Sequence, residues 1–85
     1  MDLRHLELLR ELADRGTLAA VAAATFRSPS AVSQQLQNAE RAVGTTLVEP
    51  DGRRVRLTAA GRLLAAGAVE VATALSRLQR DLDEL

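Results

Sequence analysis

The segment SPSAVSQQLQN, residues 28–38, decides the fold of this chain, because it predicts a helix with a sharply fixed start and two unlike faces. Ser28 is a good N-cap, since its hydroxyl can accept a hydrogen bond from the unpaired N–H groups of the first turn. Pro29 suits the first helical position, where no N–H is needed. The residues that recur at helical spacing and predict the buried face are Val32, Leu36, Ala39 and Val43.

The outer face of this helix carries hydroxyls and amides but no charge. Its residues are Pro29, Ser30, Ser33, Gln34 and Gln37. Amides and hydroxyls can donate and accept hydrogen bonds on base edges, which a helix in the major groove of DNA must do. A helix face that only meets water usually carries Glu and Lys instead. We therefore expect this face to read DNA, with an ordinary polar surface as the alternative.

The residues before this segment predict two further helices. Asp2 can cap a helix over 2–15 in which leucines repeat every three residues, and Gly16 ends it in a left-handed conformation. Thr17 caps a shorter, Ala-rich helix over 18–25. Only a three-residue break (25–27) separates this helix from the next, and two helices joined so tightly are typical of a helix-turn-helix.

The helix that begins after Ser28 runs to about Val43 and stops at Gly44, and the period of the sequence then changes. The residues at 47–48 and the alternating RVRL at 54–57 predict two short strands, joined by the turn Pro50-Asp51-Gly52. Such a hairpin is only marginally stable alone, so it must lean on the helices. We interpret it as a wing beside the helix-turn-helix.

Two arginines, Arg53 and Arg54, stand at or beside the tip of this wing, where they could reach DNA. Arginine on a surface turn can also serve solubility alone, which is the alternative.

Thr58 caps the last and longest predicted helix, which shows no stop signal before the chain ends. Apolar residues recur along it at alternating spacings of 4 and 3, which is a heptad seam. The seam consists of Leu64, Ala68, Val71, Leu75, Leu78, Leu82 and Leu85. So small a domain cannot cover the whole seam, so a second copy should do so and form a homodimer. We expect the N-terminal half of the helix to pack within its own chain, at Leu63 and its neighbours.

The composition favours a single, mostly α-helical domain. With 85 residues, 47% of them hydrophobic, the chain is near the lower size for an independent core and should gain stability from a partner. Phe26 is the only aromatic residue, so the core must be aliphatic. There is no Cys, which excludes a disulfide framework or thiolate metal site, and nothing at the N-terminus resembles a signal or membrane segment. A cytoplasmic location is the default expectation.

Net charge is zero, but its distribution is uneven. Residues 27–62 hold six Arg and three acidic residues, whereas both flanking segments are net negative. Every cation is Arg, which permits bidentate contacts and groove insertion, although a bias of the genome towards Arg codons would give the same composition. The middle third is thus the part suited to nucleic acid.

No pattern of an enzyme is present. His5 is the only histidine, and on a capped, Leu-rich helix it is more often a surface or packing residue than a base or metal ligand. No Gly-rich phosphate loop or paired-carboxylate spacing appears. We expect neither catalysis nor a metal or cofactor.

At this point the chain resembles the N-terminal DNA-binding domain of LysR-type transcriptional regulators over essentially its whole length. The motifs that carry the resemblance are MDLR (1–4) with the Leu-rich helix, GTL (16–18), SPSAVSQQL (28–36), Glu40 before Val43-Gly44, GRRVRLT (52–58) and Ala60-Gly61. The resemblance implies a winged helix-turn-helix followed by a linker helix that dimerises, usually antiparallel, and leads into a separate effector-binding domain. That domain is absent here, so we expect a fragment of a longer regulator, with a naturally short protein as the alternative.

The resemblance also implies roles for individual residues. It places Pro29, Ser30, Ser33 and Gln34 at the major groove, starting from the Ser28 cap. Gln35 and Gln37 would lie near the backbone or flanking bases, with Gln35 partly turned towards the core. Arg53 would enter the minor groove from the wing, with Arg54 beside it.

The chain departs from the family pattern at several positions. The family usually has Gln at the position of Pro29 and a basic residue at the position of Pro50, so we expect specificity to shift towards Ser30, Ser33 and Gln34. Apolar residues are usual where Thr25 and Arg27 stand. Phe26, between these two, should therefore rotate inward to fill the gap.

The sequence thus predicts a winged helix-turn-helix DNA-binding domain at 1–57 and a linker and dimerisation helix at 58–85. We expect it to bind double-stranded DNA sequence-specifically, as a dimer on an inverted-repeat operator. The competing hypothesis is a protein-interaction module in which a winged helix and coiled coil assemble a complex without DNA, and the neutral net charge supports it. Binding to duplex DNA that weakens with salt would separate the two.

Overall fold

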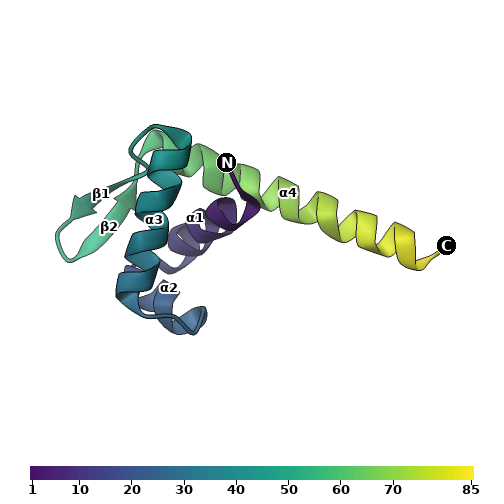
Figure 1. The fold of residues 1–85 in the computed structure, drawn as a ribbon, viewed down its shortest axis with the longest axis horizontal. Coiled ribbons are helices and arrows are strands. Elements are labelled where there is room, and N and C mark those ends of the chain that lie inside the picture. The colour runs from purple at the N-terminus through teal and green to yellow at the C-terminus, as the bar shows by residue number, and fades with distance from the viewer.

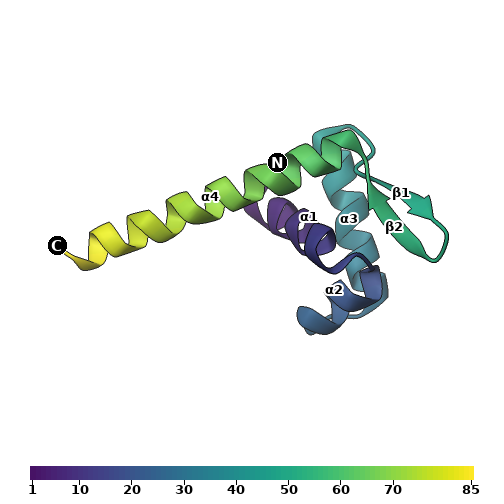
Figure 2. The same ribbon diagram turned by 180° about the vertical axis from the view of Figure 1, so that it is seen from behind.

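A computed structural model describes all 85 residues and contains four helices and one two-stranded hairpin (Figure 1). The elements in chain order are α1 (Leu3–Arg15), α2 (Leu18–Ala24), α3 (Pro29–Val43), β1 (Val48–Asp51), β2 (Arg54–Leu57) and α4 (Ala59–Asp83). Helices α1 to α3 and the hairpin gather at one end of the molecule, and α4 projects from them (Figures 1 and 2). The predicted winged helix-turn-helix with a long terminal helix is confirmed.

Each helix begins at the predicted cap, where a side-chain oxygen accepts a hydrogen bond from a backbone N–H of the first turn. The distances from acceptor to donor nitrogen are 2.8 Å for Asp2 and Arg4, and 3.1 Å for Thr17 and Ala20, Ser28 and Ala31, and Thr58 and Gly61. Helices α1 and α3 end at Gly16 and Gly44, both at φ 83°, where a residue without Cβ meets no steric penalty.

The core is aliphatic, as the composition predicts. Its most deeply buried large side chains are Leu9, Val21, Val32 and Leu47, which come from α1, α2, α3 and the segment before β1. Helix α1 contacts both α3 and α4, and it contributes Leu8, Leu9 and Leu12 to the core. The three short helices therefore share one core with the start of the long helix.

The turn between α2 and α3 contradicts the prediction for Phe26, whose side chain is 97% exposed. The N–H of Arg27 donates to the carbonyl of Ala22 at 2.9 Å, which closes the C-terminus of α2 in a Schellman arrangement. That arrangement requires a left-handed residue at the intervening position, and Phe26 adopts φ 56° there. The left-handed backbone turns the side chain outward, and a pocket of about 260 Å³ floored by Leu8, Val21 and Val32 remains beside Thr25 and Arg27.

The wing is an antiparallel pair in which Val48 faces Leu57 and Asp51 faces Arg54. Pro50 lies within β1, opposite Val55, and not in the turn where the sequence places it. Proline is tolerated there because each strand of a two-stranded hairpin is an edge. The loop consists of Gly52, at φ 63°, and Arg53, which is the residue pattern of a type II′ turn.

The first half of α4 packs on α1, with Gly61, Ala65 and Ala68 buried. Ala68 is only 2% exposed, contrary to its expected place in the dimer seam, and Leu64 is half-buried against the core. Leu63 is 72% exposed, contrary to the expectation that it packs within its own chain. The register of the heptad explains both errors, because the line of contact with α1 passes through Ala65 and Ala68.

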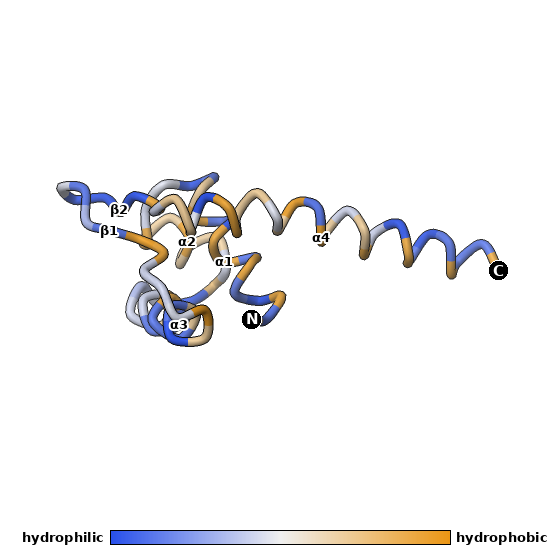
Figure 3. The backbone as a smooth tube through the Cα atoms, turned by 90° about the horizontal axis from the view of Figure 1, so that it is seen from above, coloured by the Kyte–Doolittle hydropathy of each residue, from blue (hydrophilic) through white to orange (hydrophobic).

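The second half of α4 extends beyond the other elements, and its apolar residues alternate with hydrophilic ones (Figure 3). The remaining seam residues are exposed, namely Val71, Leu75, Leu78, Leu82 and Leu85. By length and composition alone α4 is also apolar enough to cross a membrane. Its packing on α1 and its one-sided apolar stripe are instead the features of an amphipathic helix.

Candidate nucleic-acid interface

Helix α3 presents the uncharged polar face that the sequence predicts. Ser30, Gln34 and Gln37 are exposed on the side opposite the buried Val32 and Leu36. Ser33 is half-buried at the edge of this face. Ser28 and Pro29 are exposed at its start, and the serine hydroxyl is already used by the N-terminal cap. The face therefore offers hydroxyl and amide groups to an incoming ligand.

Gln35 lies off this face, on the flank of α3 that turns towards α1. It is half-buried, and its amide oxygen accepts a hydrogen bond from the guanidinium of Arg27. Both residues line the pocket between α1, α2 and α3. The amide of Gln35 is therefore occupied within the domain, as its partial turn towards the core suggests.

Arg41 and Asn38 extend the polar surface of α3 and were missed by the sequence reasoning. The side-chain oxygen of Asn38 accepts hydrogen bonds from Gln34, at 3.2 Å, and from the guanidinium of Arg41. Arg41 is exposed and continues the spacing of 4, 3 and 4 that starts at Ser30. The same helical spacing, extended by one turn beyond Gln37, predicts that Arg41 lies on this face.

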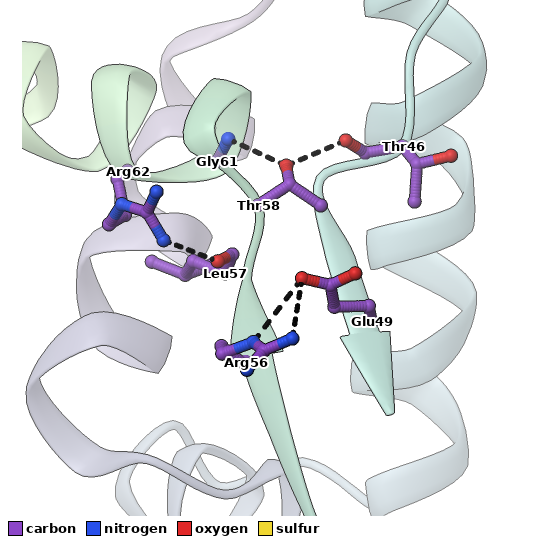
Figure 4. A network of polar contacts seen from close by, with 7 residues as sticks. All are labelled: Thr46, Glu49, Arg56, Leu57, Thr58, Gly61 and Arg62. Carbon is purple, nitrogen blue, oxygen red and sulfur yellow. Dashed lines mark hydrogen bonds and ion pairs between the residues drawn. The ribbon is translucent and has the colours of Figure 1, made fainter. Parts of the chain in front are cut away.

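The two wing arginines lie in different surroundings. Arg53 is exposed at the loop of the hairpin and has no hydrogen-bond partner. The guanidinium of Arg54 instead lies against Gly16, at the C-terminus of α1, with Nη2 3.8 Å from the position a Cβ of Gly16 would take. Arg56 pairs with Glu49 across the hairpin at 3.1 Å, as Figure 4 shows. Arg53 is thus the cation at the wing tip that is free to meet an anion.

Two of the three acidic residues in the middle third are engaged, whereas Asp51 is exposed at the end of β1 beside the wing loop. Glu49 is paired with Arg56, and a carboxylate oxygen of Glu40 accepts the N–H of Leu47 at 2.8 Å. At the far end of the domain, hydrogen bonds from Arg4 lower the pKa of the Asp2 carboxyl. The positive charge of the middle third therefore remains available at Arg41 and Arg53.

His5 is half-buried on α1, and its Nδ1 atom has no hydrogen-bond partner. No group of three or more His, Asp or Glu side chains is placed to hold a metal ion. The polar surface of α3 and the wing is accordingly the site that the chain builds.

These elements define a winged helix-turn-helix domain with a candidate recognition helix and an arginine-tipped wing. The family described as "Bacterial regulatory helix-turn-helix protein, lysR family" matches residues 3–62. The chain therefore belongs to the lysR family.

Comparison with individual proteins agrees. The chain is 36% identical over 84 residues to the HTH-type transcriptional activator IlvY of Salmonella typhimurium, covering 99% of this chain and 28% of IlvY. The full-length regulator LysG from Corynebacterium glutamicum with bound effector Arg has a TM-score of 0.89 at 28% identity, over 99% of this chain and 29% of LysG. The DNA complex of the CbnR DNA-binding domain also has a TM-score of 0.89, at 27% identity, over 99% of this chain and 97% of that domain.

The chain is therefore a LysR-type DNA-binding domain and not an enzyme. It spans little more than a quarter of the length of the full-length relatives, 28% of IlvY and 29% of LysG. Of the two hypotheses from the sequence, the DNA-binding one is confirmed. As part of a transcription regulator, the domain acts inside the cell.

Proposed function

We propose that α3 reads base edges in the major groove through Ser30, Ser33, Gln34 and Gln37, with Ser28 and Pro29 at its entry. The uncharged polar face of α3 supports this proposal, since Ser30, Gln34 and Gln37 are exposed opposite the buried face of the same helix, with Ser33 half-buried at its edge. Hydroxyls and amides suit base edges, where both donors and acceptors must be matched. Arg41, one turn further, would contact phosphate at the edge of the groove.

Arg53 would enter the adjacent minor groove or contact its backbone from the wing. Its exposure and lack of a partner support this role. Arg54, held beside Gly16, would support the wing from behind. Gln35, already bonded to Arg27, would serve the recognition helix indirectly.

We further propose that the domain binds as a homodimer through the exposed second half of α4. Val71, Leu75, Leu78 and Leu82 form an apolar stripe that no residue of the chain covers. An antiparallel pair of such helices would place the two recognition helices at opposite ends, which suits an inverted repeat. On this proposal residues 1–57 contact DNA and residues 58–85 link and dimerise.

The parent regulator would carry an effector-binding domain beyond this segment and act in the cytoplasm. The short span relative to the full-length relatives supports this inference, as does the LysG structure with its bound effector.

Selection of bound sites from random duplexes, followed by binding measurements on the selected site, tests base reading. Ser33→Ala and Gln34→Ala should each lose about 1–3 kcal/mol on the selected site and much less on random DNA, because they remove base contacts and leave phosphate contacts. Ala42→Ser, on the exposed surface of α3 outside the proposed face, is the matched control. Equal losses on both DNAs would overturn the assignment.

A further inference from the structure

The recognition helix and the dimerisation helix share little direct contact, although their relative orientation decides where two half-sites must lie. Both pack on α1, and otherwise they meet through the short segment between α3 and β1. That segment ends at Leu47, which is completely buried. Its attachments therefore control how α3 and α4 are joined.

From the side of α3, Glu40 is hydrogen-bonded to this segment. One carboxylate oxygen of Glu40 accepts the N–H of Leu47 at 2.8 Å, across seven residues of chain. The side chain is half-buried, and no arginine pairs with it. Its contact is thus with the backbone of the joint and not with a surface cation.

From the side of α4, Thr58 is bonded to the same segment, and Figure 4 shows its hydroxyl between the Thr46 carbonyl and the Gly61 N–H. The N–H of Thr58 donates to the carbonyl of Leu47 at 3.0 Å, and its hydroxyl donates to the carbonyl of Thr46 at 2.7 Å. A Cβ at Gly61 would lie 2.2 Å from the Leu47 carbonyl oxygen, so only glycine permits this approach. Both amide groups of Leu47 are therefore fixed, one by each helix.

A small rotation at this joint has a large effect at a distance. Helix α4 has 25 residues and is about 37 Å long at ~1.5 Å per residue. A rotation of about 5° would move the far end by about 3 Å, close to the rise of ~3.4 Å per base along one strand. An error of a few degrees in the joint is thus equivalent to one base pair of half-site spacing.

We propose that Glu40, through Leu47, is a positioning residue that sets the spacing of half-sites to which the dimer binds. It touches no base in this arrangement and acts through the angle between α3 and α4. The proposal rests on the proposed dimeric binding to an inverted repeat. On this proposal, a side chain outside the polar face of α3 decides which half-site spacing the dimer prefers.

The first test uses inverted repeats of the selected half-site whose spacing varies in steps of one base pair. The unmodified chain should bind the best spacing about tenfold or more tightly than its neighbours, because a misplaced second half-site loses linked binding. Glu40→Ala should reduce this ratio to about threefold or less, with half-site affinity changed less than about twofold. Glu40→Gln, whose amide oxygen can still accept the Leu47 N–H, should restore the ratio.

Val21→Ala is the control for stability, because Val21 is fully buried in α2, which makes neither of the hydrogen bonds that fix Leu47. It should lower the melting temperature and keep the spacing preference. If Glu40→Ala keeps the full ratio, or Val21→Ala reduces it equally, the proposal is wrong. Should Glu40→Ala not fold, Thr58→Ala replaces it, with Thr17→Ala as a control that also removes a helix cap.

The second test needs no DNA and therefore separates failure of the joint from failure of the dimeric function. The chain has no cysteine, so Ala31→Cys and Glu84→Cys give one spin label on α3 and one at the end of α4. Dilution with unlabelled chain isolates distances within one copy. The distance distribution should broaden in Glu40→Ala and stay narrow in Glu40→Gln and Val21→Ala. Equal widths in all variants would overturn the proposed role of Glu40, whatever the chain does on DNA.

Discussion

Phe26 combines two features that are uncommon together, a positive φ and a large exposed side chain. Left-handed backbone costs a non-glycine residue about 1–2 kcal/mol, since Cβ crowds the following carbonyl. The turn between α2 and α3 accepts this cost because the Schellman hydrogen bond of Arg27 requires it. Replacing Phe26 by glycine should therefore relieve this strain, and it should leave no cavity because the ring is exposed.

We predict that Phe26→Gly leaves stability unchanged or raises it by up to about 1 kcal/mol, the lower strain being partly offset by the larger entropy of the unfolded chain. For a domain of this size that is a melting temperature up to about 4–8 °C higher at fixed protein concentration. Ala23→Gly, on the exposed side of α2, should lower it. A loss of about 3 kcal/mol or more for Phe26→Gly would mean that the ring is packed in the core.

The residues that could be predicted from sequence are those whose role is local. The caps Asp2, Ser28 and Thr58 were correct, because each bonds a backbone N–H within three residues of itself. The inward prediction for Phe26 failed, because a family pattern of apolar neighbours says nothing about the hydrogen bond that closes the turn. The position of the Arg54 guanidinium beside Gly16 likewise depends on where the wing meets α1, and no spacing in the sequence reveals that contact.

At the scale of single elements, helix α1 depends on an ionised cap. Hydrogen bonds from Arg4 hold the pKa of Asp2 below its ordinary value of 3.8, so the folded state favours the carboxylate. The contribution of this cap to stability is therefore present above that pH and is lost as the pH falls through the lowered pKa. This contribution should disappear at acid pH, whereas a cap made by an asparagine side chain would not change with pH.

We expect Asp2→Asn to change the pH dependence of stability, because Asn caps a helix but does not titrate. Urea unfolding of both chains between about pH 5 and pH 2.5 measures this. The unmodified chain should lose its advantage over Asp2→Asn towards acid pH, whereas a difference independent of pH would exclude an ionised cap.

The wing illustrates how much of an element can be predicted and how much cannot. Alternation at 54–57 and Gly52 predicted the hairpin, because pleat and turn preferences are local. The place of Pro50 inside β1 was missed, since a Pro-Asp-Gly run is also a common turn. The two arginines at the tip could not be told apart without the packing of the wing on α1.

Arg53 and Arg54 should differ when DNA affinity is measured against salt. Arg53→Gln should lower the slope of log affinity against log salt by about one, because one phosphate contact is lost. Arg54→Gln should keep the slope and lower affinity about two- to fivefold, because it loosens the wing from the C-terminus of α1. Equal falls in slope would place both side chains on the DNA backbone.

On the scale of the whole molecule, the shape is that of a compact head with a projecting arm about half uncovered, and its longest extent is 50 Å. Gly61 lets α4 approach the Leu47 carbonyl, Ala65 and Ala68 are buried further along the helix, and the seam turns to solvent only beyond them. The dimer seam stays a prediction for its exposed part from Val71 onwards, whereas its first part packs within the domain itself. The register of that switch depends on α1 and could not be read from α4 alone.

Leu78→Asp should prevent the proposed dimer from forming, because Leu78 is 65% exposed at the centre of the apolar stripe. Affinity for a full site should fall towards that for a single half-site as linked binding is lost. Ser76→Asp introduces the same side chain on a different side of α4 and should leave the dimer intact. Light scattering at micromolar concentration checks both, and a monomeric unmodified chain would contradict the proposal.

The net positive charge lies in the middle third of a chain whose overall net charge is zero, and this distribution bears on how such a domain searches along DNA. Each phosphate contact strengthens attachment to any DNA, so a domain with few of them spends less time on irrelevant sequence. The price is a slower encounter, since long-range attraction to the duplex is weak.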